Sequence, residues 1–267
     1  LKCHVFSTIG SHGSLTVEQA LMNSCNPYMI HLALEMGNSR FAYYQSLFGF
    51  GKITGIDLPG ETTGIVYGDR MTTIDAACNS FGQTINVNMM QMMAAYCSII
   101  NGGMLYQPHI VKRIESANGE VVKEYKANLV RQTITASTSK LLRRYLKNTV
   151  EEGTAKKAGV TGYSVAGKTG TAQKGDRKDN KWIISFIGHA PAENPKFAIY
   201  VVIDEPYGTT GTSGSSADVL TLTHNILEKL LPYMNVYKDA SDEYEDTSSS
   251  PDELTVDGIP AGTASSN

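Results

Sequence analysis

Three β-rich segments in the second half of the chain, joined by short connections, constrain what this sequence can fold into. They cover residues 163–173, 182–189 and 197–203, and the last two are rich in branched and aromatic side chains. Connections of this length suit antiparallel hairpins. An amphipathic helix is expected to follow over residues 217–231.

Helices are expected to precede these strands. Thr16 and Gln19 have the spacing of a capping box, which predicts a short helix over residues 17–22. Pro27 suits the first position of a second helix, which Gly37 ends. Further helices are expected over residues 39–48, 88–100 and 138–152, and a hairpin over residues 109–126. This order predicts an α+β fold in which an antiparallel sheet is flanked by helices.

Two of these helices carry a more specific expectation. Ser39 is expected to cap the helix over residues 39–48. The methionine-rich segment 88–100 is expected to be a buried core helix.

Composition limits the classes of protein that remain. The chain has 267 residues, of which 41% are hydrophobic, and this suffices for one large domain. A net charge of -3 gives no reason to expect a nucleic-acid partner. Residues 236–267 are acidic and Ser-rich, which predicts a linker or disordered tail after a domain over residues 1–235. The chain begins with Leu1, so we expect a piece of a longer protein, with any membrane anchor outside it.

The cysteines are far apart in the sequence. Cys3, Cys25, Cys78 and Cys97 form no CxxC pair, and the histidines show no HExxH spacing. We therefore expect free thiols and neither a metal site nor a redox pair.

Two short polar motifs are candidates for chemistry. Lys168, Thr169, Gly170 and Thr171 lie together in the first expected strand, where glycine admits a ligand backbone and lysine offers a positive charge. Ser24 and Asn26 fall on the connection between the first two helices, where such residues serve either as caps or as polar groups on a cleft wall. Each motif alone is also compatible with a purely structural role.

Taken together, the two motifs follow a known order. Penicillin-recognising serine enzymes carry S-x-x-K, then S-x-N, then K-T-G. The surrounding sequence resembles the transpeptidase domain of class B penicillin-binding proteins, most of all the division and sporulation enzymes of Gram-positive bacteria. The similar segments are residues 13–37, 54–61, 80–114, 150–158, 166–174 and 185–206. The resemblance implies an antiparallel sheet sandwiched between helices.

The nucleophile motif of that family is missing where it belongs. The chain's S-x-x-K, Ser137 to Lys140, lies between the other two motifs and resembles the capped start of a helix. We therefore expect the domain to be incomplete at its N-terminal side, with the nucleophile outside this chain.

The resemblance also implies roles for the site residues. The reaction is acyl transfer on stem peptides ending in D-Ala-D-Ala, which β-lactams mimic, and it needs no cofactor. Ser24 relays a proton, Asn26 binds the substrate amide, and Lys168 holds Ser24 and attracts the terminal carboxylate. Thr169 and Thr171 bind that carboxylate, the Thr171 N–H forms half of the oxyanion hole, and the strand at Gly170 pairs with the substrate backbone.

The implied setting is the outer face of the bacterial cell membrane, with glycosyltransferase or divisome partners. Two alternatives remain open at this point. A β-lactam hydrolase shares both motifs but needs a deacylating base, and a non-catalytic module would bind wall peptides or division partners. The Gly/Ser/Thr-rich segment 207–217 is either a flap beside the cleft or a solvated connector.

Overall fold

The computed structural model describes residues 3, 5, 10–176, 178, 181–206 and 215–240. Its helices are α2 (Val17–Met22), α3 (Asn26–Met36), α4 (Asn38–Leu47), α5 (Thr73–Asn79), α6 (Met89–Ile100), α7 (Ala136–Glu151) and α8 (Ala217–Tyr233). Two 3-10 turns are η1 (Gly68–Arg70) and η2 (Lys156–Ala158). Its strands are β1 (Met104–Gln107), β2 (Arg113–Glu115), β3 (Val121–Glu124), β4 (Asn128–Gln132), β5 (Ala166–Lys174), β6 (Lys181–Ala190) and β7 (Phe197–Asp204).

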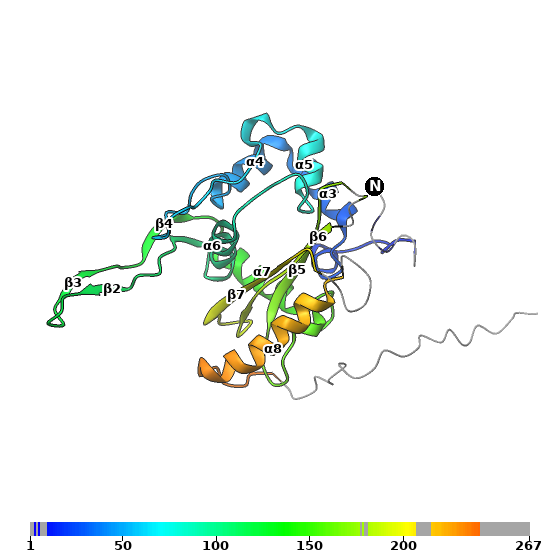
Figure 1. Cartoon of the computed structure of the whole chain (residues 1–267). Helices are drawn as coiled ribbons and strands as arrows, with labels where there is room; N and C mark the ends of the chain where they lie inside the picture. The colour runs from blue at the N-terminus through cyan, green and yellow to red at the C-terminus, as the bar shows by residue number, and fades with distance from the viewer. Residues whose placement is uncertain are drawn as a thin grey trace, which may run out of the picture.

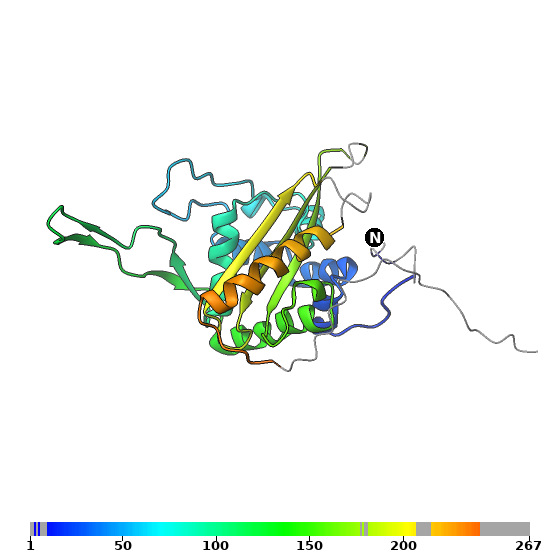
Figure 2. The ribbon, with the colours of Figure 1, turned by 60° about the horizontal axis from the view of Figure 1, so that its bottom comes forward.

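The centre of the molecule is an antiparallel sheet between two layers of helices. Its strand order is β5-β6-β7, and both pairings are antiparallel, as the short connections predict. Helix α8 covers one face and packs around Phe186, while α6 and α7 cover the other face around Ile187 (Figures 1 and 2). The predicted α+β class is therefore confirmed.

Two glycines make room for the largest side chain of this core. Gly167 and Gly188 are register partners on β5 and β6, and the fully buried ring of Phe186 lies over both. A Cβ added at Gly167 would lie 2.3 Å from the Phe186 ring, and one added at Gly188 would lie 2.5 Å from it. Close packing at this level leaves no room for a side chain at either position.

A buried polar pair joins α6 to the sheet. The Tyr96 hydroxyl lies 2.8 Å from Nδ1 of His189, and Nε2 of His189 lies 3.0 Å from the carbonyl of Ala192. Because a carbonyl only accepts, Nε2 carries the proton, so Nδ1 accepts from Tyr96. Burial lowers the pKa of His189 to about 4, which keeps the imidazole neutral.

The second group of strands extends away from the central sheet. Strands β1 and β4 pair with each other, and β2 and β3 form an antiparallel hairpin beyond them (Figure 1). The turn of this hairpin lies at Asn118 and Gly119, where Gly119 has φ +83. The predicted hairpin over residues 109–126 is thus confirmed in kind, with shorter strands.

One detail of the expected helices is wrong. The N-cap of α4 is Gly37, which makes no side-chain bond, so Ser39 lies inside the helix instead of capping it. Helix α6 is a core helix, as predicted: Tyr96 and Ile100 are buried in the cluster around Ile187, and Met92 packs against it, although Met89 at the start of the helix is half exposed. The buried positions of α6 also include two polar residues, Gln91 and Ser98. Gln91 satisfies its amide by donating to the carbonyls of Lys52 and Thr63, and this permits a polar residue at a core position.

The chain beyond α8 begins by packing against the body. Val236 is buried in the α8 cluster, and the Asp239 carboxylate accepts hydrogen bonds from the Ser164 backbone and hydroxyl. Residues 241–267 lie outside the described residues, so the tail over 236–267 stays a prediction. Segment 207–214, which holds most of the predicted flap or connector, lies outside them too. Within the described part of the chain, none of the helices is both long and apolar enough to span a bilayer.

Candidate active site

Ser24 sits in a strained turn between α2 and α3. Its φ is +50, a left-handed conformation that only glycine adopts freely. The turn is a Schellman motif, because the Cys25 N–H bonds to the carbonyl of Ala20 and the Ser24 N–H to that of Leu21. A serine thus occupies the position where helix ends favour glycine. Such strain is typical of functional positions.

The residues after Ser24 start α3 one position earlier than expected. Cys25 is the N-cap, and Asn26 and Pro27 are the first two helical residues, so the missing N–H of Pro27 removes no intrahelical bond. Asn26 is half-buried. Among the described residues, its side chain makes no hydrogen bond with Ser24, Lys168 or Thr169.

Lys168 reaches from the central sheet to this turn. Its Nζ lies 3.0 Å from the Ser24 hydroxyl, and also 3.1 Å from the Thr169 carbonyl and 3.3 Å from the Thr169 hydroxyl. The ammonium therefore donates to three oxygens, all of which belong to two predicted site residues, Ser24 and Thr169. Burial lowers its pKa to about 8, because the charged form loses hydration.

Strand β5 lies at the edge of the described three-stranded sheet. Thr169 pairs with Phe186 in the register, and Thr171 with Ile184, so the two threonines share one face and Lys168 lies on the other. Thr171 is exposed and Gly170 is half-buried. Within the described part of the chain, β5 has a ladder partner on one side only, which leaves the backbone groups of its other side unpaired by a strand.

The loop after α7 brings the two motifs together, a role that the sequence did not reveal. The Thr154 N–H donates to the Met22 carbonyl at the end of α2, and the Thr154 hydroxyl lies 3.3 Å from that of Thr169. At Gly153, a Cβ would lie 2.8 Å from the same Met22 carbonyl. Residues 150–158 belong to the segments that carry the family resemblance, and this resemblance is the sequence feature that could have pointed to the loop.

Helix α7 packs against β5 and is joined to it by a buried hydrogen bond. The buried hydroxyl of Thr149 donates to the carbonyl of Gly167, immediately before Lys168 in the chain. The Asn148 side-chain amide donates to Glu18 of α2. Helix α7 therefore positions both β5, which carries the K-T-G motif, and α2, which precedes the S-x-N motif.

The S-x-x-K at residues 137–140 is the start of a helix, as predicted. The Thr135 hydroxyl caps α7 by accepting from the Thr138 N–H, and it also contacts the Ser137 hydroxyl. Ser137 and Lys140 are exposed, while Ser139 is buried and donates to the Ile99 carbonyl. These contacts give the segment a structural role.

The chain thus has a sheet between two layers of helices, and a lysine of the edge strand donates a hydrogen bond to a serine in the turn between two helices. This combination is typical of the serine acyl-transfer domains that recognise penicillin. The family model of the penicillin binding protein transpeptidase domain matches residues 6–228. The chain belongs to this family.

Named relatives agree with this assignment. The chain is 40% identical over 232 residues to stage V sporulation protein D of Bacillus subtilis, covering 85% of this chain and 36% of that protein. It is 32% identical to the peptidoglycan D,D-transpeptidase FtsI of Escherichia coli K12, covering 89% of this chain and 39% of that protein. The chain thus spans little more than a third of the length of these relatives.

Solved structures agree as well. Penicillin-binding protein 3 of Mycobacterium tuberculosis in complex with ampicillin superposes with a TM-score of 0.77 at 30% identity, covering 85% of this chain and 53% of that one. The transpeptidase domain of penicillin-binding protein 3 from Burkholderia pseudomallei gives a TM-score of 0.73 at 26% identity, covering 86% of this chain and 68% of that one.

Proposed function

We propose that this chain supplies the substrate-binding half of a peptidoglycan D,D-transpeptidase. The observation that carries the proposal is the 3.0 Å hydrogen bond from Lys168 Nζ to Ser24 Oγ. It joins the S-x-N and K-T-G motifs beside a sheet edge that can accept a peptide. The nucleophilic serine is not assigned to any residue of this chain, and a segment of the protein outside it would supply that group.

The reaction proceeds in two acyl transfers. The nucleophilic serine attacks the carbonyl of the penultimate D-alanine of a stem peptide, forming an ester and breaking the bond to the terminal D-alanine. Ser24 passes a proton to the leaving nitrogen. An amine of a second stem peptide then attacks the ester, forming the cross-link and releasing the serine.

The residues of this chain act through binding and electrostatics. The Lys168 ammonium holds the Ser24 hydroxyl and attracts the terminal carboxylate, which also binds the hydroxyls of Thr169 and Thr171. Asn26 binds the amide of the substrate. The β5 backbone pairs with the peptide at Gly170, and the Thr171 N–H donates to the oxyanion that forms during attack.

β-Lactams would acylate the same serine, because they mimic the D-Ala-D-Ala end. Two named relatives are a sporulation protein and a peptidoglycan D,D-transpeptidase, and they support a role in cell-wall synthesis during sporulation or division, with divisome or glycosyltransferase partners. The proposed place of action is the outer face of the cell membrane, held there by a segment outside this chain.

Labelling with a fluorescent penicillin tests the proposal. The complete gene product should label on one serine, and Lys168→Ala should slow labelling while Lys174→Ala, on the same strand, should not. Lys174 forms exposed ion pairs with Asp204 and Glu205, away from Ser24. Failure of the complete protein to label would overturn the proposal and favour a non-catalytic wall-binding module.

The fate of the acyl-enzyme separates synthase from hydrolase. A transpeptidase should keep the penicilloyl group for many minutes and should release D-alanine from a D-Ala-D-Ala peptide when an acceptor amine is present. Rapid turnover of penicillin without cross-linking would instead identify a β-lactam hydrolase.

A further inference from the structure

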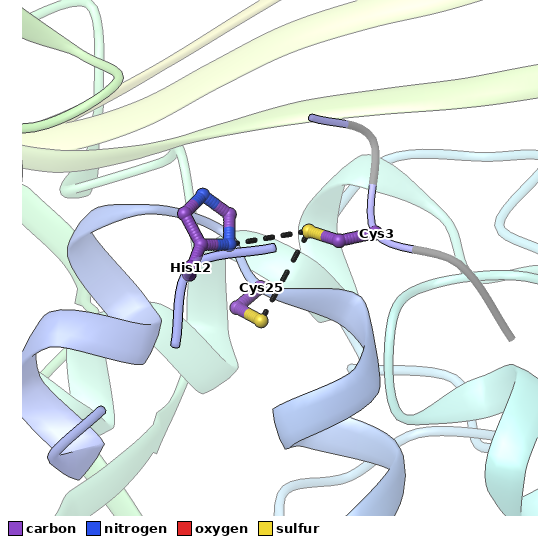
Figure 3. Close-up of side chains that lie close together, drawn as sticks. All are labelled: Cys3, His12 and Cys25. Atoms are coloured by element: carbon purple, nitrogen blue, oxygen red, sulfur yellow. Dashed lines mark hydrogen bonds between the residues drawn. The ribbon is translucent and has the colours of Figure 1, made fainter. Parts of the chain in front are cut away.

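Three sulfur and nitrogen ligands converge beside the Ser24 turn. They come from Cys3 and His12, which precede α2, and from Cys25 at the start of α3 (Figure 3). The Cys3 sulfur lies 4.0 Å from the Cys25 sulfur and 3.2 Å from Nδ1 of His12. All three ligand atoms lie within 4.8 Å of one another.

These separations suit a single tetrahedral cation. With zinc–sulfur distances of about 2.3 Å, a tetrahedral ion holds two sulfurs about 3.8 Å apart. The observed sulfur separation of 4.0 Å differs from this by a small side-chain movement. A disulfide would require the sulfurs to approach to about 2.0 Å.

The surroundings favour a soft or borderline metal over other cations. Cys3 and Cys25 are buried in an apolar cluster with Ala20, against which Leu15 and Tyr28 pack. Two thiolates and an imidazole select zinc-like ions, whereas calcium and magnesium prefer oxygen ligands. Binding replaces two thiol protons, which pass to solvent, and leaves one position of the tetrahedron for water.

We propose that Cys3, His12 and Cys25 form a binding site for a zinc-like divalent cation. The cation would tie the segment before α2 to the first turn of α3, across the strained turn that holds Ser24. Cys25 is the middle residue of the S-x-N motif, so a bound ion would fix the positions of both Ser24 and Asn26. Sequence spacing hides this site, because the two cysteines are 22 residues apart and form no short motif.

The site can be tested on this chain without any enzymatic readout. The reduced chain is titrated with Co²⁺, which reports thiolate ligands by a charge-transfer band in the near ultraviolet and a tetrahedral site by visible d–d bands. We expect saturation at one ion per chain, displacement of Co²⁺ by Zn²⁺, and a higher midpoint of thermal unfolding with zinc.

Matched cysteine variants locate the ligands. Cys3→Ser, His12→Ala and Cys25→Ser should each weaken Co²⁺ binding by at least about 10–100-fold, the loss that follows even from removing an outer-shell partner of a metal ligand, while Cys78→Ser and Cys97→Ser should leave it unchanged. If Cys25→Ser does not fold, Cys3→Ser still tests the site, because Cys3 lies outside the described helices. Unchanged bands in Cys3→Ser, or no Co²⁺ binding by the reduced chain, would overturn the proposal. Loss of two thiols on oxidation without Co²⁺ uptake would show a disulfide instead.

Discussion

The Lys168 ammonium lies 3.0 Å from the Ser24 hydroxyl, although 144 residues separate the two in the chain. Each residue is held by a different part of the fold. Lys168 belongs to the edge strand β5, and Ser24 to the Schellman turn between α2 and α3. Thr154 contacts both parts, because it bonds to the end of α2 and to Thr169.

The first prediction concerns the charge on Lys168. Lys168→Ala should lower the rate of penicillin acylation of the complete protein by about 10²–10³-fold, as expected when one electrostatic contact to the transition state is lost. The free energy of unfolding should fall little or rise, because the substitution removes a desolvated cation. Labelling kinetics and urea unfolding of the variant and of Lys174→Ala measure the two effects. Equal acylation rates in the two variants would contradict the proposed role.

The second prediction follows from the lowered pKa of Lys168, which is about 8 instead of 10.5. Below pH 8 the ammonium holds Ser24 and attracts a carboxylate, and above it this charge is lost, so acylation should decline as the pH rises through about 8. Between about pH 8 and 10.5 the unfolded chain binds the proton more tightly than the folded chain, so this lysine should make stability rise with pH. Acylation rates across this range, compared with those of Lys168→Arg, provide the test. A rate that stays level to pH 10 in the wild type would refute the assignment.

The third prediction separates the backbone and the side chain of Ser24. Ser24→Ala and Ser24→Gly both remove the hydroxyl, but only glycine relieves the left-handed conformation at φ +50. Ser24→Gly should therefore be more stable than Ser24→Ala by about 1 kcal/mol, while both label slowly with penicillin. Urea unfolding of the two variants measures the difference. Equal stabilities would mean that the turn rearranges.

The sequence predicted those features that depend on local patterns. Hairpin-length connections revealed the antiparallel sheet, and the Thr16–Gln19 capping box marked the start of α2. The motif residues themselves were visible, and the family order indicated that Ser24 and Lys168 would meet.

What the sequence did not reveal depends on long-range packing. Thr154 contacts the two motifs only after α7 packs on β5, and nothing in its local pattern indicates this. Gln91 can be buried because two distant carbonyls accept its amide protons, and the apolar pattern of α6 predicted a core helix without indicating a buried amide within it. The nearness of Cys3 to Cys25 similarly results from the folding of α2 between them.

The fourth prediction compares two glycines of β5. A Cβ at Gly167 would meet the Phe186 ring and the Ile187 carbonyl, 2.6 Å away, and neither can move without disturbing the sheet. A Cβ at Gly170 would meet the hydroxyl of Ser185, which can rotate. Gly167→Ala should therefore lower the free energy of unfolding by about 2 kcal/mol more than Gly170→Ala. Urea unfolding of both variants tests this, and a smaller loss in Gly167→Ala would show that Phe186 has another position available.

The fifth prediction concerns acid stability and the buried pair of Tyr96 and His189. The pKa of His189 is about 4 in the folded chain against 6.5 as its ordinary value, so the unfolded chain binds the proton more tightly between these limits. The contribution of His189 to the free energy of unfolding is therefore fully present above pH 6.5 and is lost as the pH falls towards 4. The total loss is about 3 kcal/mol. His189→Gln keeps a donor and an acceptor without titrating, so its unfolding free energy should depend less on pH over this range. Urea unfolding at several pH values from 4 to 7 measures the slopes, and an unchanged slope in His189→Gln would mean that other groups cause the acid sensitivity.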